Sequence, residues 1–117
     1  MGLTACKAAY RYGAQWLDDL ISYLASNLSL VRDFLKCEMP EIKLVEPEGT
    51  YLVWLDCKAL GLSDKELDDL IVHKAGLWLD AGPMFGAGGE GFQRINIACP
   101  RAILEDALER LKKAFRQ

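Results

Sequence analysis

Several features that mark common classes of protein are scarce in this chain. It has a single histidine, and its four cysteines, Cys6, Cys37, Cys57 and Cys99, never form a Cys-x-x-Cys pair. We therefore expect no metal site and no disulfide framework, only reduced and mostly buried thiols. The net charge is −3, and no cluster of lysines and arginines offers a surface for phosphates. This balance argues against a nucleic-acid partner.

Long apolar runs are missing as well. None approaches the ~20 residues that a membrane-spanning helix needs, and no basic, then apolar, then small-residue leader opens the sequence. We expect a cytoplasmic protein without a membrane partner. The chain has 117 residues, of which 51% are hydrophobic. That is enough for one domain with a single core and too little for a second full domain.

The hydrophobic pattern predicts a long N-terminal helix from about residue 4 to residue 36. Pro40 prevents its continuation. Its expected buried face recurs at alternating steps of four and three residues and consists of Leu17, Ile21, Leu24, Leu28, Val31 and Leu35. His73 lies near the end of a later helix, where an imidazole suits the helix dipole. No nucleophile stands beside it in the sequence, so we assign it no catalytic role.

The rest of the chain predicts a small mixed or antiparallel sheet packed by helices, an α+β fold. Strands are expected at residues 42–45, 51–56, 77–80 and 92–98. Ser63-Asp64-Lys65-Glu66 has the form of a capping box, and Gly76 is the expected stop of the helix that it starts. A last helix should follow Pro100, with a buried stripe of Ile103, Leu104, Ala107, Leu108, Leu111 and Phe115.

The length of the first helix has a consequence. A continuous helix of this length spans about 50 Å, whereas a compact chain of this size is roughly 35 Å across. Its N-terminal end, with Tyr10, Tyr12 and Trp16, should therefore overhang. Either the helix breaks near Gly13, or these rings pack on a partner, and an upstream domain is the partner we favour.

One strand carries an isolated cation. From Phe92 to Ala98 the side chains alternate, so Arg94 and Asn96 share one face while Ile95 and Ile97 share the other, which looks like core. A guanidinium is well shaped to hold a carboxylate by two parallel hydrogen bonds. The alternative is a salt bridge to one of the chain's own acids, and spacing alone leaves both open.

The glycine-rich loop before that strand needs separate treatment. Residues 86–91 match G-x-G-x-x-G, but the following residues alternate like a strand instead of opening a helix, so a dinucleotide site is excluded. No Lys-Ser/Thr follows the glycines either, which excludes a P-loop. We expect a mobile loop with positive φ and close backbone approach. It is either an ordinary turn or a cover for a substrate.

Three motifs in order resemble a known family. They are Ala8-Ala9-Tyr10 with Gly13 and Trp16-Leu17-Asp18, then Pro47 to Asp56 (PEGTYLVWLD), then Met84-Phe85-Gly86 with Glu90 to Arg101 (EGFQRINIACPR). Together they are similar to the C-terminal part of MalY/PatB-type cystathionine β-lyases, of the class I/II aminotransferase fold. The resemblance covers about residues 3–115. It implies a pyridoxal-phosphate (PLP) enzyme acting on an amino-acid substrate.

The resemblance also implies site residues. Arg94 matches the family's arginine for the substrate α-carboxylate, and residues of the turn and the glycine loop match positions near the active site. The full set of expected substrate-binding residues is Arg94, Gly49, Thr50, Tyr51, Phe85 and Asn96. Asn96 would either orient Arg94 or make a hydrogen bond at the strand end.

The family's lysine for PLP, its acidic partner and its phosphate-binding residues belong upstream of this region. Lys7 and Lys65 lack the family's sequence context, so we expect no catalytic or cofactor-binding residue in this chain and no PLP bound to it alone. Residues 1–36 should link to a large PLP-binding domain, with residues 37–117 forming the small C-terminal domain. The same helix could also mediate a homodimer.

A rival interpretation remains open. The chain could be a stand-alone, non-catalytic module that binds a small carboxylate or amino acid through Arg94, or that mediates assembly. Elimination and transamination cannot be separated from these residues.

Overall fold

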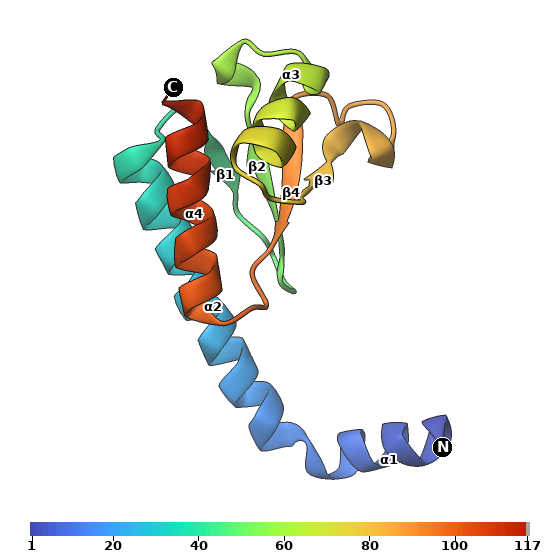
Figure 1. Ribbon diagram of the computed structural model, residues 1–117. Helices are drawn as coiled ribbons and strands as arrows, with labels where there is room; N and C mark the ends of the chain where they lie inside the picture. Colours follow the sequence, from blue (N-terminus) through green and yellow to red (C-terminus); the bar gives the residue numbers. More distant parts are fainter. Residues whose placement is uncertain (117) are drawn as a thin grey trace.

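The computed structural model describes residues 1–116, which form an α+β domain with a long N-terminal extension (Figure 1). The helices and strands are α1 (Gly2–Tyr12), α2 (Ala14–Glu38), β1 (Lys43–Val45), β2 (Leu52–Asp56), α3 (Asp64–Asp69), β3 (Asp80–Ala81), β4 (Phe92–Asn96) and α4 (Arg101–Phe115). Short helical turns occupy Lys58–Leu60, Leu70–Lys74 and Gly82–Phe85. The predicted fold class and order of elements are confirmed. The third strand lies slightly later than the expected residues 77–80.

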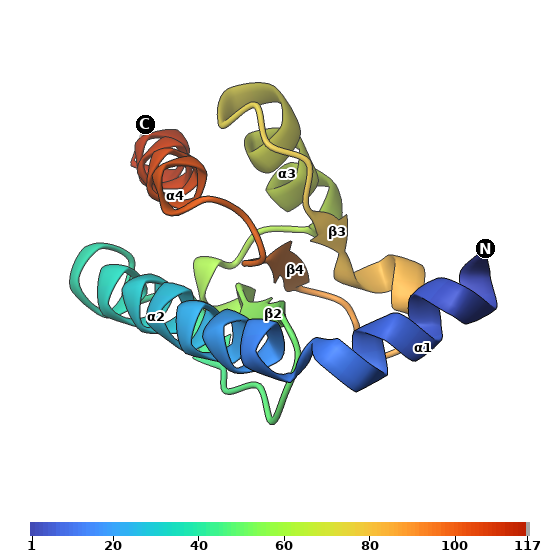
Figure 2. The ribbon, with the colours of Figure 1, turned by 90° about the horizontal axis from the view of Figure 1, so that it is seen from below.

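The four strands form one antiparallel sheet in the order β1-β2-β4-β3. One face of this sheet is buried: Val53 and Leu55 of β2 and Gln93 and Ile95 of β4 point into the core. Helices α2, α3 and α4 surround the sheet on that side, and α2 lies beside α4 (Figures 1 and 2). The opposite face carries Trp54 and Arg94, which lie directly opposite each other in the register.

The capping box explains where α3 begins. The Ser63 hydroxyl accepts a hydrogen bond from the Glu66 N–H at 3.3 Å, and a Glu66 carboxylate oxygen accepts one from the Ser63 N–H at 2.9 Å. The Ser63 hydroxyl also donates to the Glu66 carboxylate at 2.6 Å, and this bond, together with the one from the Ser63 N–H, holds the pKa of Glu66 below its usual value. Gly76, at φ 62°, ends the segment in the left-handed region, as expected. Leu67 and Ile71 are buried between these two ends.

The core is apolar and draws on every helix except α1. Its buried members in the helices include Val31, Leu35, Leu67, Leu104, Leu108 and Leu111. Each side chain of this size contributes about 1.5–3 kcal/mol through burial. The predicted stripe of α4 is confirmed for Leu104, Leu108 and Leu111, but Ile103 is 59% exposed. It lies near the beginning of α4, where it lines an open groove together with Leu79 and Ile95.

The expected single N-terminal helix is interrupted at Gly13. The Gly13 N–H still donates to the Ala9 carbonyl at 2.7 Å, but α1 then turns sharply away from the axis of α2 (Figure 1). A Cβ at Gly13 would lie 2.5 Å from the Ala9 oxygen, so the turn requires glycine. The prediction of a continuous helix is therefore wrong, and the break that we considered as an alternative is present.

The break does not bury the aromatic residues before and after it. Tyr10, Tyr12 and Trp16 are 91%, 78% and 68% exposed, and α1 has no buried residue. Leu17 and Ile21, expected on the buried face, are also exposed. The buried face of α2 starts only near Asn27. Within residues 1–116, no helix combines the length and apolar character needed to cross a membrane.

The cysteines only partly follow the prediction. All four are free, but Cys6 and Cys37 are exposed, whereas Cys57 is buried and Cys99 is half-buried. Burial, together with the nearby Asp56 charge, raises the pKa of the Cys57 thiol to about 12. Among residues 1–116, no group of three or more His, Cys, Asp and Glu side chains is arranged to hold a metal ion.

Candidate functional site

Arg94 projects from the centre of β4 and meets an acid of its own chain. Its Nε and Nη2 donate to Oδ2 of Asp80 at 3.1 and 2.8 Å. Asp80 is the first residue of β3 and lies directly opposite Arg94 in the sheet. The arginine side chain remains 24% exposed. The intramolecular salt bridge that we considered is therefore present, and it leaves part of the guanidinium accessible.

Aromatic side chains surround the same guanidinium. The Phe85 ring centre lies 4.3 Å from Cζ of Arg94, and the Trp54 ring centre lies 6.0 Å from it. Phe85 and Trp54 also contact each other edge to face, with centroids 5.2 Å apart. Contacts of a cation with a ring at such distances contribute about 0.5–2 kcal/mol. Three elements, β2, β4 and the turn after β3, thus converge on Arg94.

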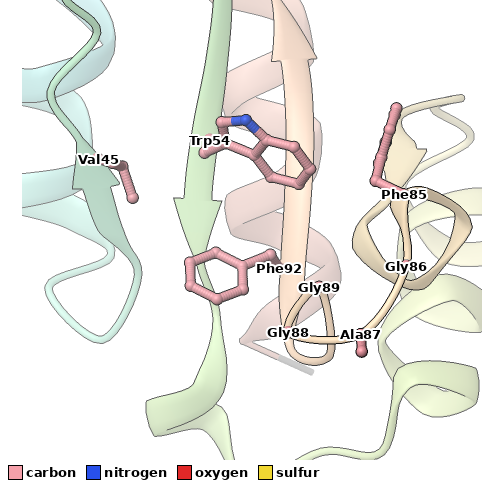
Figure 3. Close-up of a pocket in the computed structure, with 8 residues that line it drawn as sticks. All are labelled: Val45, Trp54, Phe85, Gly86, Ala87, Gly88, Gly89 and Phe92. Carbon is pink, nitrogen blue, oxygen red and sulfur yellow. The ribbon is translucent and has the colours of Figure 1, made fainter.

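A hollow of about 330 Å³ lies beside this cluster (Figure 3). Its lining residues are Val45, Trp54, Phe85, Gly86, Ala87, Gly88, Gly89 and Phe92. Figure 3 shows Val45, Trp54 and Phe92 contributed by three neighbouring strands, with the glycine-rich segment closing one end. Such a surface suits the apolar part of a small molecule whose charged group lies near Arg94.

The glycine loop has a fixed base. Gly82 and Gly89 are packed so closely that a Cβ on Gly82 would lie 1.9 Å from the Gly89 oxygen. At the end of the loop, the Gly91 N–H donates to Oδ1 of Asp64 at 2.7 Å, and the Gly91 carbonyl accepts from the Cys57 N–H at 2.8 Å. Positive φ occurs at Gly86, Gly88 and Gly91. Both expected reasons for the glycines are confirmed, and mobility of the loop stays a prediction.

The remaining expected site residues lie elsewhere. Gly49, Thr50 and Tyr51 line a second apolar groove, between the turn and α2, together with residues such as Ile21. Thr50 has φ 64°, unusual for a residue other than glycine. Oδ1 of Asn96 accepts from the Ala98 N–H at 2.8 Å, which is the strand-end hydrogen bond considered above. Phe85 is thus the expected site residue that contacts Arg94.

Sequence reasoning missed Asp80 and Trp54. Trp54 was recognised only as a strand residue within the second motif, and Asp80 was one of 17 acidic residues. Each contacts Arg94 because it lies directly opposite it in the sheet. Only the strand register, which periodicity does not supply, could have singled them out.

The described residues do not fit a PLP site. Lys65 is ion-paired to Asp69 at 2.6 Å on α3, and Lys7 lies on the exposed helix α1. Neither lines the hollow beside Arg94. The glycine-rich loop leads into β4, so no helix N-terminus is available there for a phosphate. Nζ of Lys58 lies 4.3 Å from the ring centre of Phe92, but Lys58 is not among the residues that line the hollow. Arg94 can bind an anion, whereas no lysine among residues 1–116 lines this hollow.

Comparison with known proteins identifies the class. No family model matches the chain. It is 45% identical over 113 residues to the cystathionine β-lyase PatB of Bacillus subtilis and 38% identical over 116 residues to the protein MalY of Escherichia coli, covering 97% and 99% of this chain. The chain spans only about 30% of the length of these relatives (29% and 30%).

Comparison with solved structures points to the same class of protein. Cystalysin from Treponema denticola, which contains PLP, superposes with a TM-score of 0.94 at 42% identity, covering 98% of this chain and 29% of that one. A PLP-bound C-S lyase from Staphylococcus hominis gives 0.84 at 34% identity, covering 94% and 30%. The chain therefore has the fold of the C-terminal domain of PLP-dependent transferases. More narrowly, it is homologous to the C-terminal 30% or so of MalY/PatB-type cystathionine β-lyases.

Proposed function

We propose that this chain is the C-terminal domain of a PLP-dependent C–S β-lyase or aminotransferase and that Arg94 binds the α-carboxylate of its amino-acid substrate. The similarity to the relatives described above supports the class of enzyme. The observation that carries the assignment of Arg94 is that its guanidinium is held at one edge and free at the other. Within residues 1–116, Nη1 makes no hydrogen bond.

The hollow next to Arg94 supports the same proposal. A carboxylate at the free edge would place the rest of a small ligand near Trp54, Phe85 and Phe92, which line this apolar surface. In this proposal Phe85 covers the ligand as well as stacking on the arginine. Gly49, Thr50 and Tyr51 would line the mouth of the complete site, and Asn96 would lie at its edge, where residues outside this chain complete the walls.

A larger enzyme also accounts for the N-terminal extension. We propose that residues 1–36 link to a large PLP-binding domain and that Tyr10, Tyr12 and Trp16 pack on it. Residues 37–117 then form the small C-terminal domain, although the second half of α2 already packs in its core through Val31 and Leu35. Dimer formation through the N-terminal helix is a secondary proposal that rests on the same exposed rings.

The chain alone should have no lyase or aminotransferase activity. When bound, PLP supplies an electron sink for bond cleavage next to the substrate amino group, and its lysine would come from the part of the enzyme that this chain does not span. The contribution of this chain is to bind and orient the carboxylate. Adding PLP to the isolated chain should therefore give no turnover of cystathionine.

The decisive test is the substitution Arg94→Lys in the complete enzyme. A point charge replaces a planar fork, so kcat/KM for cystathionine should fall by an amount equivalent to about 1–3 kcal/mol. The matched control is Arg32→Lys, because Arg32 makes a two-bond contact with Glu46 at 2.7 and 2.8 Å and neither of these residues lines the hollow. Unchanged kinetics for Arg94→Lys would refute the carboxylate assignment.

A further inference from the structure

We propose that Asp80 is a positioning residue: it fixes the guanidinium of Arg94 so that the free edge meets a single carboxylate of the ligand. This inference rests on the proposed function of Arg94 and assigns a role to a residue that the family resemblance did not. The salt bridge is then part of the binding site, and it leaves one edge of the Arg94 guanidinium available to a ligand.

The geometry of the pair supports this role. A guanidinium has two edges that can hold a carboxylate, one formed by Nε and Nη2 and the other by Nη1 and Nη2. Asp80 occupies the first, since its Oδ2 accepts from Nε at 3.1 Å and from Nη2 at 2.8 Å. Two of about five N–H donors are used in this way. The second edge keeps its two parallel donors for a ligand.

Two further contacts restrict how the arginine can move. The Phe85 ring lies over the guanidinium, 4.3 Å from Cζ, and so opposes rotation of its plane. The register fixes the partner too, because Asp80 and Arg94 are directly paired across β3 and β4. A short strand followed at once by the turn Gly82–Phe85 brings the acid and the ring to the same guanidinium. The side chain is thus ordered before a ligand arrives, which reduces the entropy cost of binding.

Charge gives the pair a selectivity that a lone arginine lacks. Asp80 offsets the positive charge of Arg94 in the row formed by Val45, Trp54, Arg94 and Asp80. A second cation lies nearby, since Nζ of Lys58 is 4.3 Å from the ring centre of Phe92, which lines the hollow. Because the pair has one open edge, it should accept one carboxylate group at Arg94. The substrate class that follows is an amino acid whose α-carboxylate lies at the open edge of Arg94 and whose side chain extends toward the hollow.

The test compares substitutions at Asp80 in the 117-residue chain, with sodium acetate as the probe at constant ionic strength. Binding is followed by the NMR signal of the Arg94 Nε–H and the amide signals of β4. Asp80→Ala should raise the apparent Kd for acetate about three- to tenfold, because the guanidinium loses its orientation. Asp80→Asn keeps an oxygen that accepts from Nε and Nη2, and it should bind acetate at least as tightly as the native chain.

A third variant separates orientation from charge. Asp80→Glu retains the charge but displaces the carboxylate by one methylene, so it should weaken acetate binding if orientation matters. It also keeps the proposal testable if Asp80→Ala fails to fold. Asp106→Ala is the matched control, because it removes the acid of another arginine pair, with Arg110, at a distant helix surface. It should leave the Kd for acetate unchanged.

The outcomes distinguish the two proposals. If Arg94→Ala leaves acetate binding intact, or if the native chain binds no acetate, the carboxylate site is wrong and the role of Asp80 falls with it. If Arg94→Ala abolishes binding while Asp80→Ala binds acetate as tightly as the native chain or more tightly, only the positioning role is wrong. Asp80 would then be a competitor for Arg94. Weaker binding in Asp80→Ala and Asp80→Glu with rescue in Asp80→Asn supports the proposal.

Discussion

Two regions of this molecule differ in the exposure of their large apolar side chains. In the arm, residues 2–23, Tyr10, Tyr12 and Trp16 lie largely in solvent, whereas in the body, residues 24–116, Leu55 and Leu108 are almost wholly buried. Both regions are rich in large hydrophobic side chains. The difference shows that an apolar pattern indicates which side chains should be buried. It does not indicate whether they are buried by residues of the same chain or by a partner.

The arm also lacks the interactions that stabilise the body. Helix α1 has 11 residues and no side-chain cap at its beginning, and isolated helices shorter than ~12–15 residues are marginal in water. The body has its core and its antiparallel sheet. A partner that covers the arm would therefore supply most of the stability of α1.

Amide hydrogen exchange should reveal the largest contrast between the two regions. In the 117-residue chain, amides of residues 3–16 should exchange at least about a hundredfold faster than those of residues 27–36, because exposed helices open locally while core helices open only with the whole domain. Mass spectrometry of peptides from both segments measures this ratio. Equal protection in a monomer would contradict the division and would favour the stand-alone module.

Core truncation should show the next largest difference. Leu55→Ala removes a side chain that is 2% exposed, and it should lower the free energy of unfolding by about 2–5 kcal/mol. Trp16→Ala, the control in the arm, should change it by less than about 0.5 kcal/mol. Urea denaturation followed by circular dichroism gives both values. A large loss for Trp16→Ala would mean that the arm is packed in solution.

The junction of the two regions should give the smallest effect. Asn27 is fully buried on α2, and its Nδ2 donates to the carbonyls of Ile97 at 2.9 Å and Cys99 at 3.2 Å. Asn27→Ala leaves these carbonyls without that donor and should cost about 1–3 kcal/mol. Ser22→Ala, on the solvent side of the same helix, is the control, since its hydroxyl bonds only within the helix. Similar denaturation midpoints for the two variants would argue against this anchoring role.

The periodicity of hydrophobic residues predicted most of the fold, because most helices and strands bury their apolar faces against other residues of this chain. The capping box at Ser63 and the alternation around Ile95 are local patterns, and both were confirmed. The break at Gly13 was harder to predict, because its flanking residues are good helix formers and only the chain geometry decides between bending and continuing. Ile103 fits the helical stripe in sequence, but in the structure it lies in an open groove and is 59% exposed.

The site was predictable only in part, because its contacts join residues that are far apart in the sequence. Arg94 stands out because a cation among apolar strand residues needs an anion. Its anion in this chain, Asp80, is fixed by cross-strand register, and its aromatic neighbours Trp54 and Phe85 come from separate elements. Contacts of this kind depend on how distant segments align, and no local pattern encodes them.

The back-to-back contact of Gly82 and Gly89 bears on how this loop can evolve. A Cβ on either residue would lie about 2 Å from the carbonyl of the other: 1.9 Å for Gly82 and 2.1 Å for Gly89. A side chain at either position would therefore clash with the backbone of the other. The clash cannot be relieved by a smaller residue at the other position, because that residue is already glycine. Each glycine therefore constrains the other, and no single substitution at either position can be accommodated without a change in the backbone of the loop beside Phe85.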